Sequence, residues 1–313
     1  MEIPVYLFTG FLESGKTSFI KDTIEDPDFI DGQKTLIILC EEGEEEYDEL
    51  DLAAKNIDIV TVEEEEALTE EFIKSLEEFY HPNRVLIEYN GMWKVSRLVE
   101  EVLPESWPIV QIISTIDGTT FEMYNNNMKS LLMEQVGLSD LVVFNRCDET
   151  TKKGAFKRSI KAVNRKATIF FEAEDGTPLP ETEEDLPYDI HASHLDLSDE
   201  DYGIWYMDAM EHPKKYAGKT VRMKAVVYKN RNFPSNQFVP GRFAMTCCAD
   251  DIAFIGFVCH YEGAPALANR EWIEVEAEIR CEYRKEYKGK GPVLYAKNIE
   301  KAEKPEDDLV YFN

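Results

Sequence analysis

Short apolar runs alternate with amphipathic segments over the first half of the chain. The runs are rich in β-branched and aromatic residues and lie at 4–8, 35–40, 57–62, 84–89, 109–116, 141–145 and 167–171. Segments between them, such as 68–80 and 153–163, carry apolar residues at the i, i+3/i+4 spacing of a helix. Because the strand-like runs are almost wholly apolar, helices must cover both faces of their sheet. The pattern predicts an α/β domain with a mostly parallel sheet between helices.

The pattern changes after residue 171. Glycines, prolines and acidic clusters at 172–200 break both periodicities, and we expect the linker there. Five strand-like runs without long helices between them follow at 220–228, 238–248, 253–261, 272–283 and 292–299, preceded by a helix-like segment at 199–210. Five strands within about 90 residues predict a small all-β barrel of the OB type. A β-sandwich is the alternative.

Charge divides the chain at nearly the same place. Residues 1–200 contain 17 Lys+Arg and 45 Asp+Glu, whereas residues 201–313 contain 17 of each. We therefore expect an α/β domain at 1–180, an acidic linker with a lead-in helix at 181–211, and the OB-like domain at 212–313. Two acidic runs, 41–49 and 63–66, have the composition of solvated helix faces.

The overall composition excludes several classes of protein. A chain of 313 residues, 43% of them hydrophobic, can build a core in each of two domains, which excludes wholesale disorder. The net charge of −28 repels phosphate backbones, so we expect no nucleic-acid partner. No apolar run reaches the ~18–20 residues of a membrane span, and the start of the chain lacks the basic residues of a signal peptide. We expect a cytoplasmic protein that does not itself span a membrane.

The most specific motif occupies residues 10–17, which read GFLESGKT and fit the pattern G-x-x-x-x-G-K-T. The segment follows a predicted strand and opens a predicted helix, so backbone N–H groups and the helix N-terminus can converge on a phosphate. Lys16 can reach the outer phosphates, and the Thr17 hydroxyl can ligate Mg²⁺. The alternative is a glycine-rich turn that binds nothing. The residues expected to contact the nucleotide here are Gly10, Glu13, Ser14, Gly15, Lys16, Thr17 and Ser18.

A second segment indicates which base is bound. The strand-like run 141–145 leads into Asn145, Arg146 and Asp148, where GTPases carry an N-K-x-D segment against the guanine edge. Asp148 can accept from the guanine ring N–H and exocyclic amine, donors that adenine does not present there. We therefore expect Asn145, Arg146 and Asp148 to bind GTP. The alternative for Asp148 is a cap of the following helix.

Glu88 and Gly91 lie at the end of the run 84–89. An acid at the C-terminal edge of a strand beside a phosphate loop can hold Mg²⁺ or its water, and Gly91 lets the backbone approach the γ-phosphate. The sequence therefore predicts Thr17 and Glu88 as the Mg²⁺ site.

These motifs resemble the CobW-type GTPases of the CobW/HypB/UreG group over roughly residues 3–172. Glu41, Gly43 and Glu44 fit that group's N-E-F-G-E stretch, with Cys40 where Asn is usual. The resemblance implies a P-loop NTPase fold, Mg²⁺-dependent hydrolysis of GTP to GDP, and a role in metal homeostasis beside metal-dependent client proteins.

The resemblance also implies which side chains carry hydrolysis, namely Lys16, Glu88 and, as a helper, Glu41. The group's C-x-C-C metal motif is missing, because no cysteine lies between Cys40 and Cys147. Metal insertion by the route usual in the group therefore lacks its thiolates.

Residues 187–313 resemble the C-terminal domain of YcgQ-type proteins, which are companions of a predicted permease. The distinctive string is RFAMTCCAD at 242–250. The resemblance implies a link to a permease system and gives no reaction.

Cys247 and Cys248 are the candidate ligands of Zn²⁺ or another transition metal. Six cysteines in 313 residues are no disulfide framework and are expected as thiols. Asp250, Cys259 or His260 would complete the site. Neighbours in a strand face opposite sides, so both thiols can serve one ion only across a bulge. The alternative is that they are buried core thiols.

Two hypotheses about function follow. The first is a Mg²⁺-dependent GTPase whose nucleotide state drives the OB-like domain in metal homeostasis or permease regulation. The alternative is a regulatory module that binds nucleotide with little hydrolysis and whose OB-like domain binds a partner or a metal. A generic ATPase ranks third.

Overall fold

The computed structural model describes residues 2–26, 29, 32–180, 186–230, 233–245, 251–306 and 308–312. The chain forms two compact units, Met1–Lys153 with Val163–Thr182 and Gly154–Ala162 with Glu183–Asn313. In the described residues, no helix is both long enough and apolar enough to cross a membrane.

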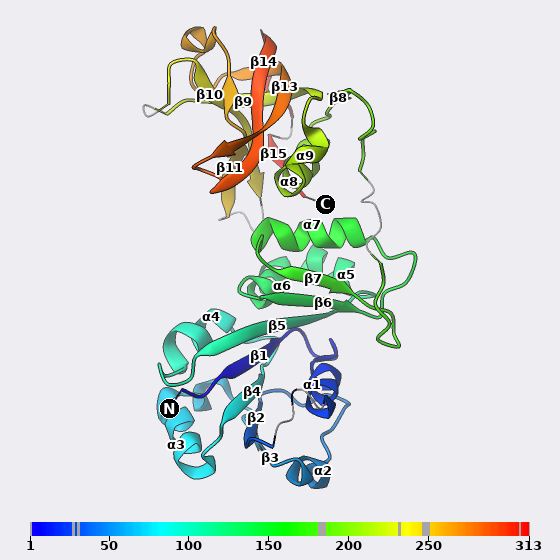
Figure 1. Ribbon diagram of the computed structural model, residues 1–313, viewed down its shortest axis with the longest axis vertical. Coiled ribbons are helices and arrows are strands. Elements are labelled where there is room, and N and C mark those ends of the chain that lie inside the picture. Colours follow the sequence, from blue (N-terminus) through cyan, green and yellow to red (C-terminus); the bar gives the residue numbers. More distant parts are fainter. Residues whose placement is uncertain are drawn as a thin grey trace. The chain divides into compact units, whose positions relative to one another are not determined.

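Seven parallel strands, in the order β3-β2-β4-β1-β5-β6-β7, form the sheet of the first unit (Figure 1). Their bounds are β1 Val5–Thr9, β2 Thr35–Leu39, β3 Ile57–Thr61, β4 Arg84–Glu88, β5 Ile109–Asp117, β6 Leu141–Asn145 and β7 Thr168–Phe171. Each strand lies within one residue of a predicted run. The predicted α/β domain with a parallel sheet is confirmed.

Apolar residues on both faces of this sheet are buried. Leu7 and Leu36 enter one hydrophobic cluster, whereas their neighbours Phe8 and Ile37 enter another, because successive side chains of a strand point to opposite faces. The helices along this part of the chain are α1 Lys16–Glu25, α2 Glu49–Ala54, α3 Glu70–Tyr80, α4 Val95–Arg97, α5 Phe121–Asn127, α6 Lys129–Val136 and α7 Lys153–Val163. A short 3₁₀ helix lies at Glu65–Ala67 and a π-helical turn at Leu98–Val102.

The expectation that residues 41–49 form a solvated helix face is wrong. The segment is irregular until α2 begins at Glu49, and Asp48 caps that helix by accepting from the N–H groups of Leu50 and Asp51. The second acidic run, 63–66, holds only the beginning of the 3₁₀ helix. In the first run, the Glu41 side chain and the Glu44 backbone N–H contact residues 10–17, called the phosphate loop from here on.

The second unit is mostly β, and eight strands among its described residues form one mixed sheet. Their bounds are β8 His194–Asp196, β9 Thr220–Tyr228, β10 Gln237–Met245, β11 Ile252–Gly256, β12 Cys259–His260, β13 Trp272–Arg284, β14 Gly289–Lys301 and β15 Leu309–Val310. Pairing runs from β9 through β10, β12, β14 and β13 back to β9, which closes a circuit. Within it only β12 and β14 pair in parallel.

Two expectations for this unit need correction. The run 253–261 is not one strand. Among the described residues β11 pairs with β10 alone, whereas β12 also pairs with β14, so the chain must bend between them. The segment expected to be linker contains β8, which pairs in parallel with β9. Local turn composition in 172–200 hid this short strand.

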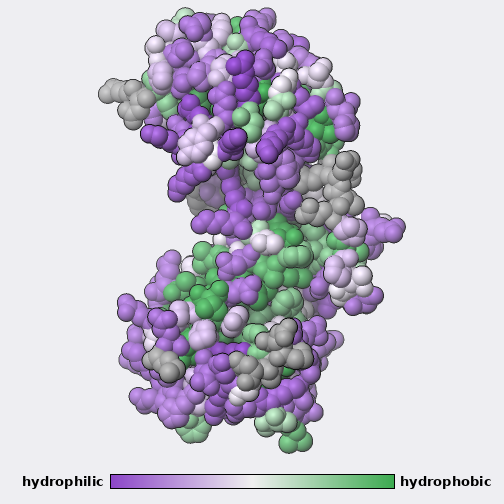
Figure 2. All heavy atoms as spheres, viewed as in Figure 1, coloured by the Kyte–Doolittle hydropathy of each residue, from purple (hydrophilic) through white to green (hydrophobic). Residues whose placement is uncertain are grey.

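The core of the second unit lies between the sheet and helix α8, Asp201–Glu211, which is followed by α9, Pro213–Tyr216. Trp205 of α8 is fully buried and packs edge-on against Phe257, and Tyr206 stacks on the same ring. Hydrophilic side chains cover most of the visible face of this unit (Figure 2). Most apolar side chains of β9 and β13 are buried, whereas Tyr228 and Tyr283 on the same strands stay exposed.

Candidate functional site

The loop at residues 10–17 connects β1 to α1 and depends on two glycines. Gly10 has φ +132°, and a Cβ there would lie 2.3 Å from the carbonyl oxygen of Thr115. Gly15 has φ +94°, and a Cβ there would lie 2.4 Å from Nδ2 of Asn145. Only glycine fits both the backbone angles and the available space. The loop therefore has the conformation its motif requires.

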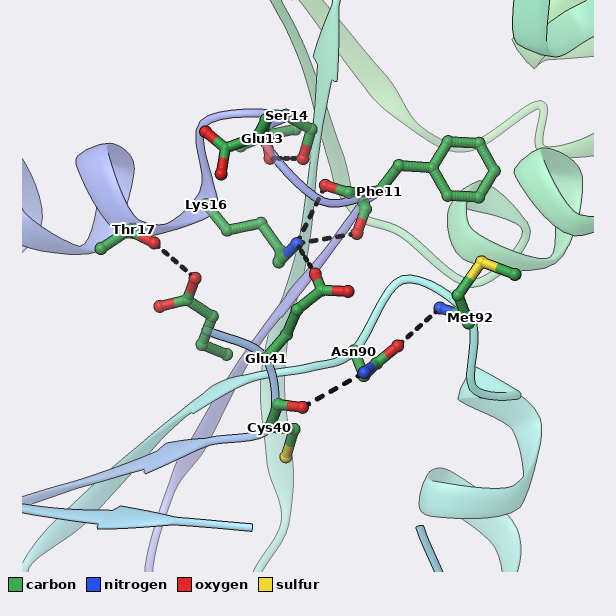
Figure 3. Close-up of polar contacts among 12 residues, drawn as sticks. Phe11, Glu13, Ser14, Lys16, Thr17, Cys40, Glu41, Asn90 and Met92 are labelled. Carbon is green, nitrogen blue, oxygen red and sulfur yellow. Dashed lines mark hydrogen bonds and ion pairs between the residues drawn. The ribbon is translucent and has the colours of Figure 1, made fainter. Parts of the chain in front are cut away.

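The Lys16 ammonium is held inside this loop. Its Nζ lies 2.9 Å from the carbonyl oxygen of Gly10, 3.0 Å from that of Phe11 and 2.7 Å from Oε2 of Glu41 (Figure 3). The side chains of Lys16 and Glu41 are 3% and 11% exposed. Each charge of this buried pair compensates the other, and either charge alone would be costly to bury there.

Glu88 is the last residue of β4, and each oxygen of its buried carboxylate accepts a hydrogen bond from one hydroxyl group. The Thr17 hydroxyl donates to Oε1 at 2.6 Å, and the Tyr47 hydroxyl donates to Oε2 at 2.6 Å. Burial raises the pKa of Glu88, and the two hydrogen bonds and the charge of Lys16 partly oppose that rise. Sequence reasoning missed Tyr47. The available signal was a single aromatic hydroxyl in an acidic run.

Thr17 and Glu88 fit a Mg²⁺ ion. A hydroxyl and a carboxylate are hard oxygen ligands, and here they are in direct contact. Both line a cavity of about 170 Å³ that Lys16 and Glu41 also border. The Lys16 ammonium and the two oxygen groups thus border one cavity.

The acidic segment after β2, residues 41–49, contacts both the phosphate loop and α1. Oε1 of Glu13 accepts from the backbone N–H of Glu44 at 2.8 Å, and Lys21 pairs with Glu45 at 2.8 Å. Among the expected nucleotide contacts, Ser14 is turned away, since its hydroxyl lies 2.9 Å from that of Thr115. Glu13 and Ser18 line the cavity.

The turn after β4 lies directly against the phosphate loop. A Cβ on Gly91 would lie 2.5 Å from the carbonyl oxygen of Gly10 and 2.6 Å from Cα of Phe11. Asn90 donates to the carbonyl oxygen of Cys40 at 3.3 Å, which joins the ends of β4 and β2 (Figure 3). Burial, together with the charges of Glu88 and Glu41, raises the pKa of the Cys40 thiol to about 12.

Asn145 and Arg146 also contact the phosphate loop. Nδ2 of Asn145 donates to the carbonyl oxygen of Ser14 at 2.7 Å. The Arg146 guanidinium donates to the carbonyl oxygen of Glu13 at 2.8 Å and pairs with Asp117 at 2.6 Å. Arg146 thereby ties the ends of β5 and β6 to the loop.

Asp148 is placed differently from its two companions. Its Oδ1 accepts from the backbone N–H and hydroxyl of Thr150 and from the hydroxyl of Thr151, and these contacts lower the pKa of Asp148. These hydrogen bonds form a local turn. Since α7 begins only at Lys153, Asp148 is not its cap.

A second cavity of about 510 Å³ adjoins the first, and Gly15, Ser18 and Arg146 line both. Asn145 and the turn at residues 172–176 supply another wall, and Asp148 lines neither cavity. Sequence reasoning missed this turn because it assigned residues 172–200 to the linker. Its signal was its position directly after the last strand of the parallel sheet.

The candidate transition-metal ligands Cys247 and Cys248, with Asp250, lie outside the described residues. Among the described residues, no group of three or more His, Cys, Asp or Glu side chains is placed to hold a metal ion. Cys259 is fully buried, and burial raises the pKa of its thiol to about 12. His260 stacks on Tyr295 with 4.7 Å between ring centroids.

Comparisons with known proteins match two successive segments of the chain to two different families. Residues 4–171 match the family described as CobW/HypB/UreG, nucleotide-binding domain, and residues 179–312 match the DUF1980 C-terminal domain. No curated protein sequence matches the chain.

Several solved structures share partial similarity. The hydrogenase maturation factor HypB from Archaeoglobus fulgidus is 18% identical over 56% of this chain and 84% of its own, with a TM-score of 0.38. The Zn(II)-bound YjiA GTPase from E. coli is 17% identical over 82% of this chain and 90% of its own, with a TM-score of 0.41. HypB from Helicobacter pylori in complex with nickel is 12% identical over 55% and 80%, with a TM-score of 0.36.

Proposed function

Because the chain belongs to the CobW/HypB/UreG nucleotide-binding family, we propose that it binds GTP with Mg²⁺ at residues 10–17 and hydrolyses it to GDP. The observation that carries the proposal is the contact between Thr17 and Glu88 in the cavity that Lys16 also lines. This arrangement offers one cation for phosphate oxygens and two oxygen ligands for a metal ion.

Each side chain has a role in this proposal. Lys16 exchanges the Glu41 carboxylate for the outer phosphates, whose charge is larger, and the backbone N–H groups at the start of α1 receive the inner ones. Glu41 is then left beside the phosphates, where it can orient the attacking water. Thr17 and Glu88 would hold Mg²⁺, which would neutralise charge on the phosphate oxygens.

The base would occupy the second cavity. Asn145 and Arg146 already line it, and a rotation of Asp148 out of its local turn would bring a carboxylate toward the guanine N–H donors. Replacing the hydrogen bonds from Thr150 and Thr151 by two from guanine makes this exchange selective, because adenine lacks those donors.

The second domain is proposed to be an OB-type barrel. The closed pairing circuit from β9 back to β9 supports this proposal. The resemblance of residues 187–313 to YcgQ-type proteins supports a role in permease regulation or metal homeostasis, with Zn²⁺ at Cys247 or Cys248 as the candidate metal. We place the protein in the cytoplasm, where GTP is available and thiols stay reduced.

The decisive experiment measures turnover of GTP and ATP by the purified full chain, with Mg²⁺ or with EDTA, and with or without Zn²⁺. We expect Mg²⁺-dependent release of phosphate from GTP and at least about tenfold less from ATP. Equal turnover of both nucleotides would favour a generic ATPase. No turnover of either nucleotide, together with no nucleotide binding by calorimetry, would overturn the proposal.

A nucleotide-binding module with little hydrolysis is the second candidate. The buried ion pair between Lys16 and Glu41 favours it, because a Lys16 that keeps this partner cannot neutralise the charge that develops on the outer phosphates during hydrolysis. Stoichiometric binding of GTP without measurable turnover would support this candidate, and the metal content of the protein as purified would show whether the second domain binds a metal.

A further inference from the structure

Tyr47 joins the acidic segment to the carboxylate of Glu88, and it is anchored on both sides. Its ring packs against the hydrophobic cluster that contains Phe8 and Ile20, and the Lys21 ammonium lies 6.0 Å from the ring centroid. The next residue, Asp48, caps α2. The phenol is therefore held from the core and from a helix end, which fixes the direction of its hydroxyl.

The buried Glu88 carboxylate requires a hydrogen-bond donor for each of its oxygens. It is only 2% exposed, so an oxygen without a donor would be costly. The Thr17 hydroxyl donates to Oε1 and the Tyr47 hydroxyl donates to Oε2, each at 2.6 Å. Lys16, the nearby cation, pairs with Glu41 instead. Without the Tyr47 hydroxyl, Oε2 would lose its donor and the carboxylate could turn toward Lys16.

We propose that Tyr47 is a positioning residue whose hydroxyl holds the Glu88 carboxylate in the orientation that serves a divalent cation beside the nucleotide. The inference rests on the proposed function. The proposal requires no proton transfer, because the hydroxyl only donates a hydrogen bond and Oε2 keeps a second lone pair for the cation or its water.

The test compares Tyr47→Phe with wild type and with Tyr6→Phe. Tyr6 packs against the same hydrophobic cluster, and its hydroxyl has no hydrogen-bond partner among the described residues. Three quantities are measured, namely GDP affinity in EDTA, Mn²⁺ affinity of the GDP complex by electron paramagnetic resonance, and the kcat and KM of GTP hydrolysis. Thermal melting confirms that each variant is folded.

Tyr47→Phe is expected to bind GDP within about twofold of wild type in EDTA, because the phosphate loop is intact. Its Mn²⁺ affinity and kcat are expected to fall about tenfold each, the effect of one hydrogen bond to a charged group, with KM little changed. Tyr6→Phe is expected to match wild type in all three quantities.

A double-mutant cycle with Glu88→Gln separates positioning from packing. If Tyr47 acts through Glu88, removing its hydroxyl in the Glu88→Gln background changes Mn²⁺ affinity less than twofold. Equal effects in both backgrounds, or wild-type Mn²⁺ affinity in folded Tyr47→Phe, would overturn the inference alone. A wild type that binds no nucleotide would overturn the proposed function and the inference with it. Should Tyr47→Phe not fold, Tyr47→Trp is measured instead and must show the same loss of Mn²⁺ affinity.

Discussion

Glu88 in the first unit and Asp208 in the second are equally buried carboxylates, each 2% exposed and each bonded to a tyrosine hydroxyl. The donors of Glu88 come from 71 and 41 residues away along the chain, and they meet it beside a cavity. The donors of Asp208 are Tyr216 and Lys215, only eight and seven residues away.

The origin of the donors distinguishes a candidate functional site from a structural contact between two helices. Contacts at the C-terminal edge of a parallel sheet gather side chains from several strand ends around open space, where a ligand can replace them. Asp208 instead joins α8 to α9, and the Tyr216 hydroxyl continues to that of Tyr188 at 2.7 Å. We therefore expect changes near Glu88 to alter function and changes near Asp208 to alter stability.

The largest effect is expected for Lys16→Ala. Removing the only side-chain cation proposed to meet the outer phosphates should weaken Mg²⁺-GTP binding at least about 100-fold, with the protein still folded. Isothermal titration calorimetry measures the loss. Lys74→Ala is the matched control, since Lys74 lies in an exposed pair with Glu70 on α3. Wild-type affinity in Lys16→Ala would exclude residues 10–17 as the phosphate site.

Glu88→Gln should leave GTP affinity within about threefold and lower kcat about 100-fold, because an amide is a poor partner for a cation and its water. Phosphate release under single-turnover conditions measures the rate. Glu25→Gln, an exposed acid at the end of α1, serves as control. Undiminished turnover would reduce Glu88 to an acid at a strand end.

Asp208→Asn should destabilise the protein by about 2–3 kcal/mol, since it weakens a buried hydrogen-bonded charge pair, and should leave GTP turnover unchanged. Differential scanning calorimetry and denaturant unfolding measure the change in the free energy of unfolding. The control is Asp196→Asn in the short strand β8, where the side chain is 69% exposed. A loss of turnover without a loss of stability would contradict the structural role assigned to Asp208.

Asp148→Asn should weaken GTP binding about tenfold and improve binding of xanthosine triphosphate, because Asn presents a donor where guanine also presents one. Competition titrations with GTP, ATP and xanthosine triphosphate check this. The neighbouring Glu149→Gln controls for the loss of charge. If wild type binds GTP and ATP equally well, the proposed base contact does not exist.

The smallest effect concerns two buried thiols, one in each unit. Burial raises the pKa of Cys40 and of Cys259 to about 12. The thiolate is the reactive form, so at pH 8 only about one thiol in ten thousand is ionised, and the fraction rises tenfold with each pH unit below that pKa. Alkylation of the native protein, read by mass spectrometry, should therefore modify the half-buried Cys281 before Cys40 and Cys259. Alkylation of Cys40 but not Cys259 would show that the phosphate site opens and the second core does not.

Much of the fold could be predicted because its signals are local. The apolar runs of the parallel sheet, the phosphate loop between β1 and α1, and the strands β9 and β13 follow from alternation over five to ten neighbouring residues. The resemblance to the CobW group came from the same local motifs and is confirmed by the family match at residues 4–171. Strand β8 and the bend between β11 and β12 could not be predicted, because pairing partners far along the chain decide them.

The sequence by itself determined where the candidate phosphate site lies, since the motif at residues 10–17 is local and includes Lys16 and Thr17. Only the tertiary structure decided what those groups contact. The order of strands places β2 beside β4, so the segment after β2 brings Glu41 to Lys16 and Tyr47 to Glu88. Such contacts depend on which strand ends become neighbours, and periodicity along one chain carries no information about that choice.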